Sequence, residues 1–140
     1  MAPRIQVTFD AADPHALSEW WADLLDYEIE RDGDFVAGLL AQGLVTGADV
    51  VDRDGILHFA DAASMHDPEG VGPRFFFQRV PEPKAGKNRV HLDLAVAQDD
   101  LEDAVERVVA TGAAFIEYGS QGDHRWAVMQ DPEGNEFCMH

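Results

Sequence analysis

The sequence predicts an α+β domain made of two copies of one motif. In each half, a strand with alternating polar and apolar residues precedes a helix and then several further strands. The second copy begins roughly 85 residues after the first. The tetrapeptide Asp-Pro-Glu-Gly also occurs twice, at residues 67–70 and 131–134, each time before a strand near the end of its half. Asp-Pro-x-Gly is a common turn sequence, so it supports the repeat only as a secondary observation.

The first half begins with a strand at residues 4–10 and continues into a helix. Polar and apolar residues alternate along the strand, which is typical of a sheet with one buried face. Asp13 is suited to the N-cap of the helix and Pro14 to its first turn. Apolar residues then follow at helical spacing: Leu17, Trp20, Trp21, Leu24 and Leu25. The pattern predicts an amphipathic helix.

The rest of the first half contains shorter elements. Residues 27–33 are expected to form a short strand that ends in a turn, and residues 34–45 a short helix. A further strand is expected within residues 55–63, followed by a loop at residues 66–73. Residues 74–80 are rich in strong β formers and predict a strand with Phe75 and Phe77 on its buried face.

The second half repeats this order after a connector at residues 81–88 that is rich in proline and lysine. Residues 88–97 alternate in polarity and predict a strand. Its apolar face comprises Val90, Leu92, Leu94 and Val96. Three further strands are expected at residues 113–119, 124–130 and 135–140.

A helix is predicted between these strands, at residues 99–112. Asp99 and Glu102 have the spacing of a capping box, and Gly112 suits the C-terminal cap. Apolar residues at helical spacing are expected to form the buried stripe: Leu101, Val105, Val108 and Val109.

The composition of the chain indicates which classes of partner it does not favour and which cellular compartment suits it. The chain has 140 residues, of which 46% are hydrophobic and 26% charged, as in an ordinary globular domain. Its net charge of −17 disfavours binding to nucleic acid or to anionic membranes. A single cysteine, Cys138, suits a reducing compartment. The N-terminal residues lack a signal-peptide pattern and no segment is long enough to span a bilayer, so we expect a soluble cytoplasmic protein.

Polar side chains on the first and last strands of the two halves are the candidates for a functional site. His91 and Asp93 share the polar face of the strand at 88–97. The corresponding faces of the other strands carry Gln6, Thr8, Gln78, Glu136 and Cys138. If the halves pack with pseudo-twofold symmetry, these faces line one cavity. Imidazole and thiolate ligands favour zinc, iron or copper over calcium. The alternative is a set of polar residues on solvated sheet faces.

Several of these residues have competing interpretations. Asp93 lies two residues beyond His91, about 7 Å along a regular strand, and is expected to share the cavity without being a second ligand. Cys138 is either a thiolate ligand or a small buried hydrophobe. Phe76 shares a face with Gln78, so it is expected to give the cavity an apolar wall, and Trp126 does the same from the second half.

Three segments stand out: "FQRVPEPK", "NRVHLDL" and "DPEGNEFC". They resemble the glyoxalase-like domain family of the vicinal oxygen chelate superfamily, which includes glyoxalases, bleomycin-resistance proteins and dioxygenases. The resemblance covers essentially the whole chain. It implies a single domain, residues 1–140, with module one at about 1–82, a connector at about 81–88 and module two at about 88–140. Each module would be a βαβββ unit, and their curled mixed sheets would surround a shared cleft.

The resemblance also implies positions for a metal. In metal-dependent relatives each module supplies one ligand from its first strand and one from its last strand. These positions fall on Gln6 and His91, and on Gln78 and Cys138. Glyoxalase I-type enzymes carry glutamates on the last strands, whereas Glu136 lies two residues before the expected place. The implied cofactor is one divalent metal (zinc, nickel, iron or manganese) or none.

The sequence leaves two main functions open. The first is a glyoxalase-like lyase or isomerase for a small polar molecule, with His91 and Glu136 as candidate catalytic residues. Its substrate-binding residues would be Gln6, Thr8, Phe76, Gln78, Asp93 and Trp126. The second is a protein that sequesters a small molecule without chemistry, as bleomycin-resistance relatives do. A vestigial cleft with a structural role is the third interpretation. Related domains often pair, so a homodimer is expected.

Overall fold

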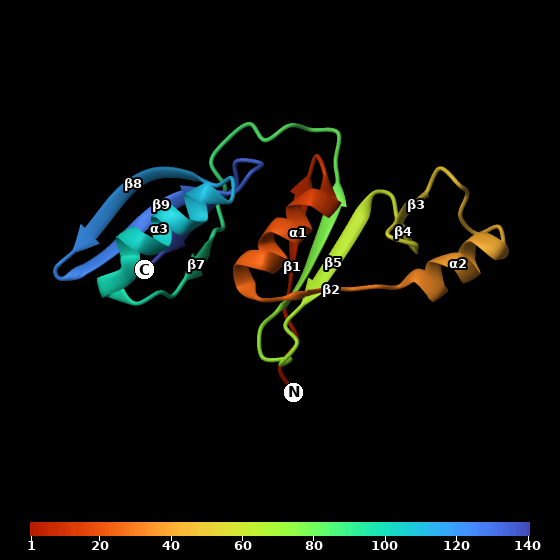
Figure 1. Ribbon diagram of the computed structural model, residues 1–140, viewed down its shortest axis with the longest axis horizontal. Helices are drawn as coiled ribbons and strands as arrows, with labels where there is room; N and C mark the ends of the chain where they lie inside the picture. The colour runs from red at the N-terminus through yellow and green to blue at the C-terminus, as the bar shows by residue number, and fades with distance from the viewer. The chain divides into compact units, whose positions relative to one another are not determined.

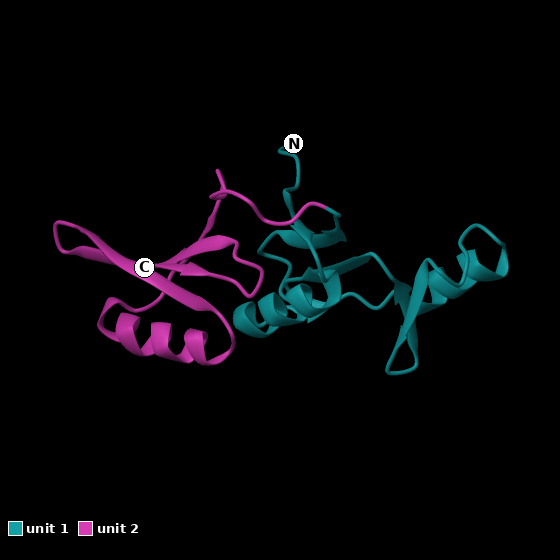
Figure 2. Cartoon of the chain, turned by 90° about the horizontal axis from the view of Figure 1, so that it is seen from above, with its two compact units in different colours: residues 1–81 teal, residues 82–140 magenta.

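The structure is a computed structural model that describes residues 1–140 (Figure 1). The chain divides into two compact units, residues 1–81 (unit 1) and residues 82–140 (unit 2), which Figure 2 shows in different colours. Each unit combines a four-stranded sheet with helices, so the predicted α+β class is confirmed. None of the helices is long and apolar enough to cross a lipid bilayer.

Unit 1 is built on one four-stranded sheet. Its strands are β1 (Gln6–Ala11), β2 (Glu28–Ile29), β5 (Ala62–His66) and β6 (Arg74–Arg79). Their order in the sheet is β1-β6-β5-β2. β1 and β6 pair in parallel, whereas the other two pairs are antiparallel. The first strand of the unit therefore lies beside its last strand.

A helix, α1 (Pro14–Leu25), covers one face of this sheet (Figure 1). The carboxylate of Asp13 accepts hydrogen bonds from the backbone N–H groups of His15 and Ala16, as predicted for an N-cap. Alternate strand residues point to α1 and form the core with Trp21. The opposite sheet face carries mostly polar side chains, and it is left uncovered by α1.

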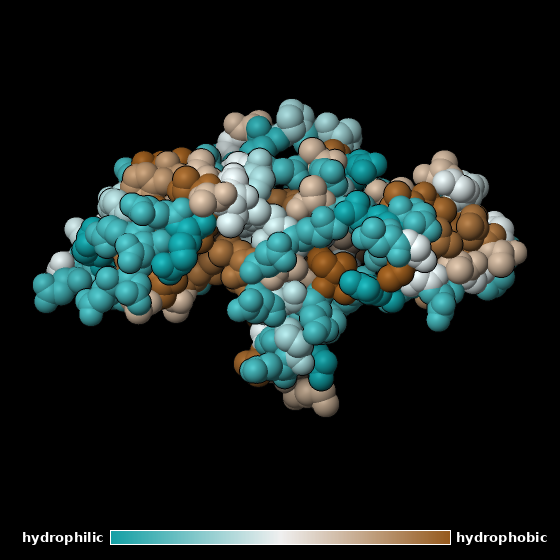
Figure 3. Space-filling view, viewed as in Figure 1, coloured by the Kyte–Doolittle hydropathy of each residue, from teal (hydrophilic) through white to brown (hydrophobic).

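An insertion between β2 and β5 adds α2 (Gly33–Ala41) and a hairpin of β3 (Val50–Arg53) and β4 (Ile56–Phe59). The helix and β4 were predicted from the sequence, whereas β3 and β5 were not. α2 buries Val36 and leaves Phe35 62% exposed, while Leu44 just after it is 67% exposed. Figure 3 shows hydrophobic surface at α2.

Unit 2 has the same strand order as the sheet of unit 1. Its strands are β7 (Leu92–Leu94), β8 (Ala114–Gln121), β9 (His124–Gln130) and β10 (Glu136–Met139), arranged β7-β10-β9-β8. β7 and β10 pair in parallel, as β1 and β6 do. The helix α3 (Leu101–Ala110) follows a short 3₁₀ turn, Gln98–Asp100.

The shared order confirms the internal repeat, because each unit contains a βαβββ motif with its first and last strands adjacent. The two Asp-Pro-Glu-Gly segments also adopt matching turns before the last strand of each unit. Asp67 and Asp131 each accept a hydrogen bond from the glycine N–H three residues on, and both carboxylates bind further backbone N–H groups. Gly70 and Gly134 have φ angles of 70° and 87°, which favour glycine.

Two details of unit 2 differ from the predictions. The strand expected at residues 88–97 is limited to β7, and Val90 is 83% exposed instead of buried. The predicted capping box of Asp99 and Glu102 is absent, because a 3₁₀ turn shifts the start of the helix. Asp100 is the N-cap residue of α3, and its side chain makes no capping hydrogen bond.

The buried stripe of α3 also differs in part from the prediction. Leu101, Val105 and Val108 are buried as expected, whereas Val109 is 40% exposed and Ala104 takes its place. Gly112 follows the C-cap residue Thr111 with a φ of 113°, which agrees with its predicted role in ending the helix.

The N-cap of α1 gives a first test of this fold. Asp13→Ala removes the carboxylate that accepts two backbone hydrogen bonds, so we expect the free energy of unfolding to fall by about 1 kcal/mol. Urea denaturation followed by circular dichroism measures the change. Asp23→Ala, at an exposed position of the same helix, is the matched control and should alter stability little.

Candidate functional site

His91, Asp93 and Cys138 form a cluster within unit 2. One potential ligand atom from each residue lies within 4.8 Å of the other two. The ring Nδ1 of His91 lies 3.0 Å from Oδ1 of Asp93, and Sγ of Cys138 lies within 4.8 Å of both side chains. The cluster is accessible, since the side chains of His91 and Asp93 are 38% and 52% exposed.

Strand pairing explains why these residues meet. Asp93 and Cys138 are direct partners in the parallel pair of β7 and β10, so their side chains emerge from the same sheet face. His91 precedes β7 and lies outside the regular strand. Its ring contacts the carboxylate of Asp93, although the backbones of residues i and i+2 are about 7 Å apart along a strand. The structure makes Asp93 a potential ligand, which the sequence analysis did not expect.

The thiol of Cys138 has a raised pKa. Burial is the largest cause, followed by the negative charge of Asp93 and the hydrogen bond to its carboxylate. The thiol therefore holds its proton at neutral pH, and Cys138 by itself is a poor nucleophile.

The donor set of the cluster fits a divalent transition metal. Imidazole nitrogen, carboxylate oxygen and thiolate sulfur are all zinc ligands, and catalytic zinc sites keep three protein ligands and one open position. A bound cation would also replace the proton of the thiol, since thiolate is the ligand form.

Glu136 is engaged elsewhere in unit 2. Its carboxylate accepts a hydrogen bond of 2.9 Å from the backbone N–H of Asn88 and lies 3.2 Å from Nζ of Lys84. Burial opposes ionisation of this carboxyl, but the backbone N–H groups and Lys84 outweigh it and lower its pKa to about 2. Glu136 thus ties residues 84–88 to the start of β10.

Trp126 lies on the same face of the unit 2 sheet as the cluster. It is paired with Gly119 on β8, where an added Cβ atom would collide with the indole ring. The ring is flanked by His124, whose centroid is 6.0 Å away, and His124 in turn contacts His140 at 5.4 Å. Glycine at position 119 therefore lets the indole lie over β8, on the side of β9 that is away from the cluster.

The candidate residues of unit 1 lie together on the uncovered face of its sheet. The amide of Gln6 contacts Thr8, and its oxygen accepts a hydrogen bond from Arg74 at 2.5 Å. The amide of Gln78 donates to Asp10 at 2.8 Å. Both glutamine amides thus have partners within unit 1.

Phe76 lies between the two glutamine positions, directly opposite Thr8. Its ring is partly exposed, and the guanidinium of Arg74 stands 5.9 Å from the ring centroid. This face therefore combines an aromatic surface with polar groups.

A polar network on this face was not predicted from the sequence. Arg74 forms a bidentate ion pair with Glu30, with both N···O distances at 2.7 Å, and also donates to Ser64. His66, which was expected to lie in a loop, is the last residue of β5. No sequence motif marks these residues, because they come from β5, from β6 and from the residue after β2, which are separate along the chain.

Comparison with known proteins identifies the family. Residues 6–140 match the Glyoxalase-like domain family, so the chain belongs to that family and the resemblance noted in the sequence is confirmed. A search of curated proteins found no match.

Solved structures with the same fold include a glyoxalase/bleomycin resistance protein/dioxygenase family enzyme from Burkholderia phytofirmans PsJN. It is 16% identical, with a TM-score of 0.60 over 96% of this chain and 94% of that one. The fosfomycin resistance protein FosX from Mesorhizobium loti is 12% identical, with a TM-score of 0.64 over 100% and 91%. A point mutant of FosX from Listeria monocytogenes, complexed with Mn(II) and 1S,2S-dihydroxypropylphosphonic acid, is 10% identical, with a TM-score of 0.63 over 100% and 90%.

Glu136→Gln tests the role of this carboxylate in holding residues 84–88. Because the folded pKa is lowered from 4.5 to about 2, the charged form stabilises the protein above pH 4.5, and this stabilisation is lost as the pH falls toward 2. We expect the free energy of unfolding of the variant to be about 1–2 kcal/mol lower than that of wild type at pH 7. Near pH 2 the difference in this free energy should be smaller. Denaturant unfolding at several pH values measures it, with Glu106→Gln on the exposed side of α3 as control.

Gly119→Ala tests the placement of Trp126. The added methyl group collides with the indole, so we expect an altered near-UV circular dichroism signal and a fall in stability of about 1–3 kcal/mol. Gly47→Ala is the matched control, since a Cβ there meets no atom within 4 Å. Identical spectra for wild type and Gly119→Ala would contradict the described position of the indole.

Proposed function

We propose that the protein is a glyoxalase-like lyase or isomerase that acts on a small polar organic molecule with the help of one divalent cation. The cluster of His91, Asp93 and Cys138 carries this proposal, because it offers three ligand atoms within 4.8 Å of one another on an accessible sheet face. Membership of the glyoxalase-like domain family supports it. Zinc, nickel, iron and manganese are the candidate ions.

The proposed ligand set differs from the four positions that the family resemblance implies. His91 and Cys138 are kept, and Asp93 is added. Gln6 and Gln78 are left out of the proposed ligand set, because their amides already have partners in Arg74 and Asp10.

The chain's own residues would prepare the site in two ways. The carboxylate of Asp93 orients the ring of His91 through the contact of 3.0 Å. It also holds the thiol of Cys138 next to the ring until a cation displaces the thiol proton. When bound, the cation would polarise a substrate oxygen and stabilise negative charge that develops there. Trp126 would provide an apolar wall for the substrate on the same sheet face.

Sequestration of a small molecule without chemistry is the second candidate. It is favoured by the state of Glu136, the carboxylate that the sequence suggested as an acid or base. With a pKa of about 2 and an ion pair with Lys84, this carboxylate is a very weak base at neutral pH. A ligand that binds tightly and is recovered unchanged would favour this function. A homodimer in the cytoplasm is proposed for either function.

Metal content tests the proposed cluster first. Protein purified without a histidine tag should contain or take up close to one tightly bound divalent cation per chain, and His91→Ala should lose it, because one of the three ligands is removed. Elemental analysis after dialysis gives the stoichiometry. His58→Ala, which changes a histidine of the β4 strand, is the control and should keep the ion. Absence of a tight ion from wild type after reconstitution would contradict the metal-dependent function.

Proton release tests the role of Cys138. Since the thiol has a raised pKa and is protonated at pH 7, zinc binding should release about one proton from it. Calorimetric titrations in buffers with different ionisation enthalpies measure this number. Cys138→Ser should release about one proton fewer than wild type and bind zinc more weakly. Equal proton release in both proteins would exclude Cys138 as a ligand.

A further inference from the structure

We propose that His15 and His58 form a pH-sensitive contact, which holds the β3–β4 hairpin on α1 at neutral pH and releases it when His58 is protonated. His15 lies in the first turn of α1, and His58 lies on β4. Their imidazole rings meet edge to face, with the centroids 5.7 Å apart. Both residues belong to unit 1, so this histidine pair is separate from the cluster of His91, Asp93 and Cys138 and does not depend on the proposed function.

His15 connects the helix to the hairpin directly. It is only 6% exposed, and its Nε2 lies 2.8 Å from the backbone carbonyl oxygen of Phe59, at the end of β4. A carbonyl oxygen can only accept, so Nε2 carries the proton and donates this hydrogen bond. The ion pair between Arg53 on β3 and Glu19 on α1 is a second link. Movement of the hairpin away from α1 would break both links.

The hairpin depends on such contacts for its order. β3 and β4 form a two-stranded sheet of their own, apart from the four-stranded sheet of unit 1. A two-stranded hairpin is at best marginally stable by itself in water. Its other neighbour is α2, where the ring of Phe35 lies 6.5 Å from that of Phe59. Weakening the contact with α1 is therefore expected to open the hairpin locally, while the four-stranded sheet stays folded.

A proton on His58 would add charge at a place that already favours the neutral ring. The side chain is partly buried, and burial is the largest cause of its lowered pKa. Neighbouring cationic groups are the next causes, from α1, from β3 and from the segment after β2: His15 when protonated, Arg53 and Arg31. Asp32 acts in the opposite direction, but it does not outweigh the others. The imidazolium is therefore better stabilised by water, outside the closed contact.

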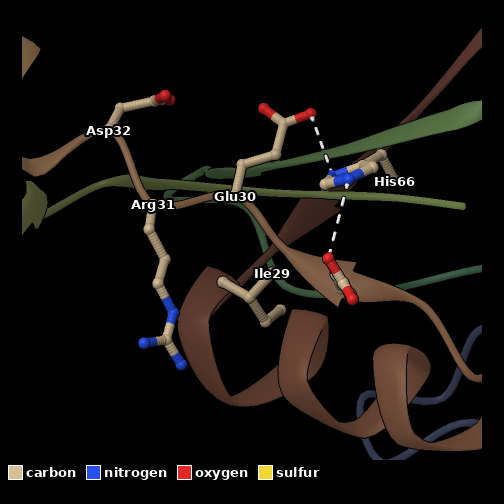
Figure 4. A pocket seen from close by; sticks show the side chains of 6 residues that line it. Ile29, Glu30, Arg31, Asp32 and His66 are labelled. Atoms are coloured by element: carbon tan, nitrogen blue, oxygen red, sulfur yellow. Dashed lines mark ion pairs between the residues drawn. The ribbon is translucent and has the colours of Figure 1, made fainter. Parts of the chain in front are cut away.

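His66, also in unit 1, has the opposite surroundings. Figure 4 shows its imidazole between two carboxylates, with Glu28 4.0 Å from Nε2 and Glu30 3.9 Å from Nδ1. A proton on this ring would be balanced by negative charge on both sides. The charges around each histidine thus decide whether a proton stabilises or destabilises its surroundings, and His66 serves as an internal control for His58.

The direction of the pH dependence follows from the lowered pKa of His58. The stabilisation from its neutral ring is fully present above pH 6.5, the ordinary value for histidine, and is lost as the pH falls toward the lower folded value. One pH unit corresponds to a factor of ten, so at pH 5.5 the closing equilibrium can weaken by at most about tenfold. Ordinary carboxylates, with pKa values near 4, are still ionised at that pH.

Hydrogen exchange of the whole chain at pH 7.5 and 5.5 tests the contact. Protection factors, corrected for the intrinsic pH dependence of exchange, should fall about threefold to tenfold for residues 50–59 at pH 5.5 and stay constant for β6. His58→Gln cannot be protonated, so its hairpin should have equal protection at both pH values, even if the substitution itself weakens the hairpin. His66→Gln is the matched control and should show the same loss as wild type.

Two further measurements separate a pH-sensitive contact from a merely structural one. In wild type, the ring NMR signals of His58 should titrate below pH 6.5, and the hairpin amide signals should change at the same midpoint. His15→Ala removes the donor to Phe59 and should reduce hairpin protection already at pH 7.5. Constant protection of the wild-type hairpin between the two pH values would overturn the proposal. A loss like that of wild type in His58→Gln would overturn it as well.

Discussion

Pairing of the first strand with the last strand of the same unit determines where most candidate side chains lie. β1 pairs in parallel with β6, and β7 with β10, so residues far apart in sequence become neighbours on one sheet face. The pair of Asp93 and Cys138 follows directly from this register, as does the pair of Gln6 and Arg74. A shift of one residue in either register would turn these side chains to the opposite face, against the helix.

The helices maintain this arrangement by covering only one face of each sheet. Large apolar residues beneath α1 and α3, including Phe77, Met65, Met129 and Phe137, are fully buried. Their burial supplies the hydrophobic free energy that holds each unit together. The face away from the helix is therefore free to carry histidine, carboxylate, thiol and aromatic groups, which contribute little to folding and are suited to binding.

The groups that surround each carboxylate give the acidic residues of the chain different roles. Glu136 and Glu30 are each paired with a cation and have lowered pKa values, so both are fixed carboxylates that orient other groups. Glu136 holds residues 84–88, which precede His91, and Glu30 faces His66. Asp93 instead meets a histidine and a thiol, groups that a metal can bind after releasing protons.

Much of the fold was predictable because local patterns specify local structure. The sequence by itself determined the α+β class, the repeat, the N-cap at Asp13 and the strands around Phe75 and Trp126, since strand alternation, helix spacing and turn residues act over a few positions. The short strands β3 and β5 and the true length of β7 were missed, because strand pairing rather than local propensity defines them. Only the tertiary structure brought His91 to Asp93 and Cys138, tied Glu136 to Lys84, and placed His66 between Glu28 and Glu30. These contacts depend on register between strands that are distant in sequence, and no local pattern encodes such a register.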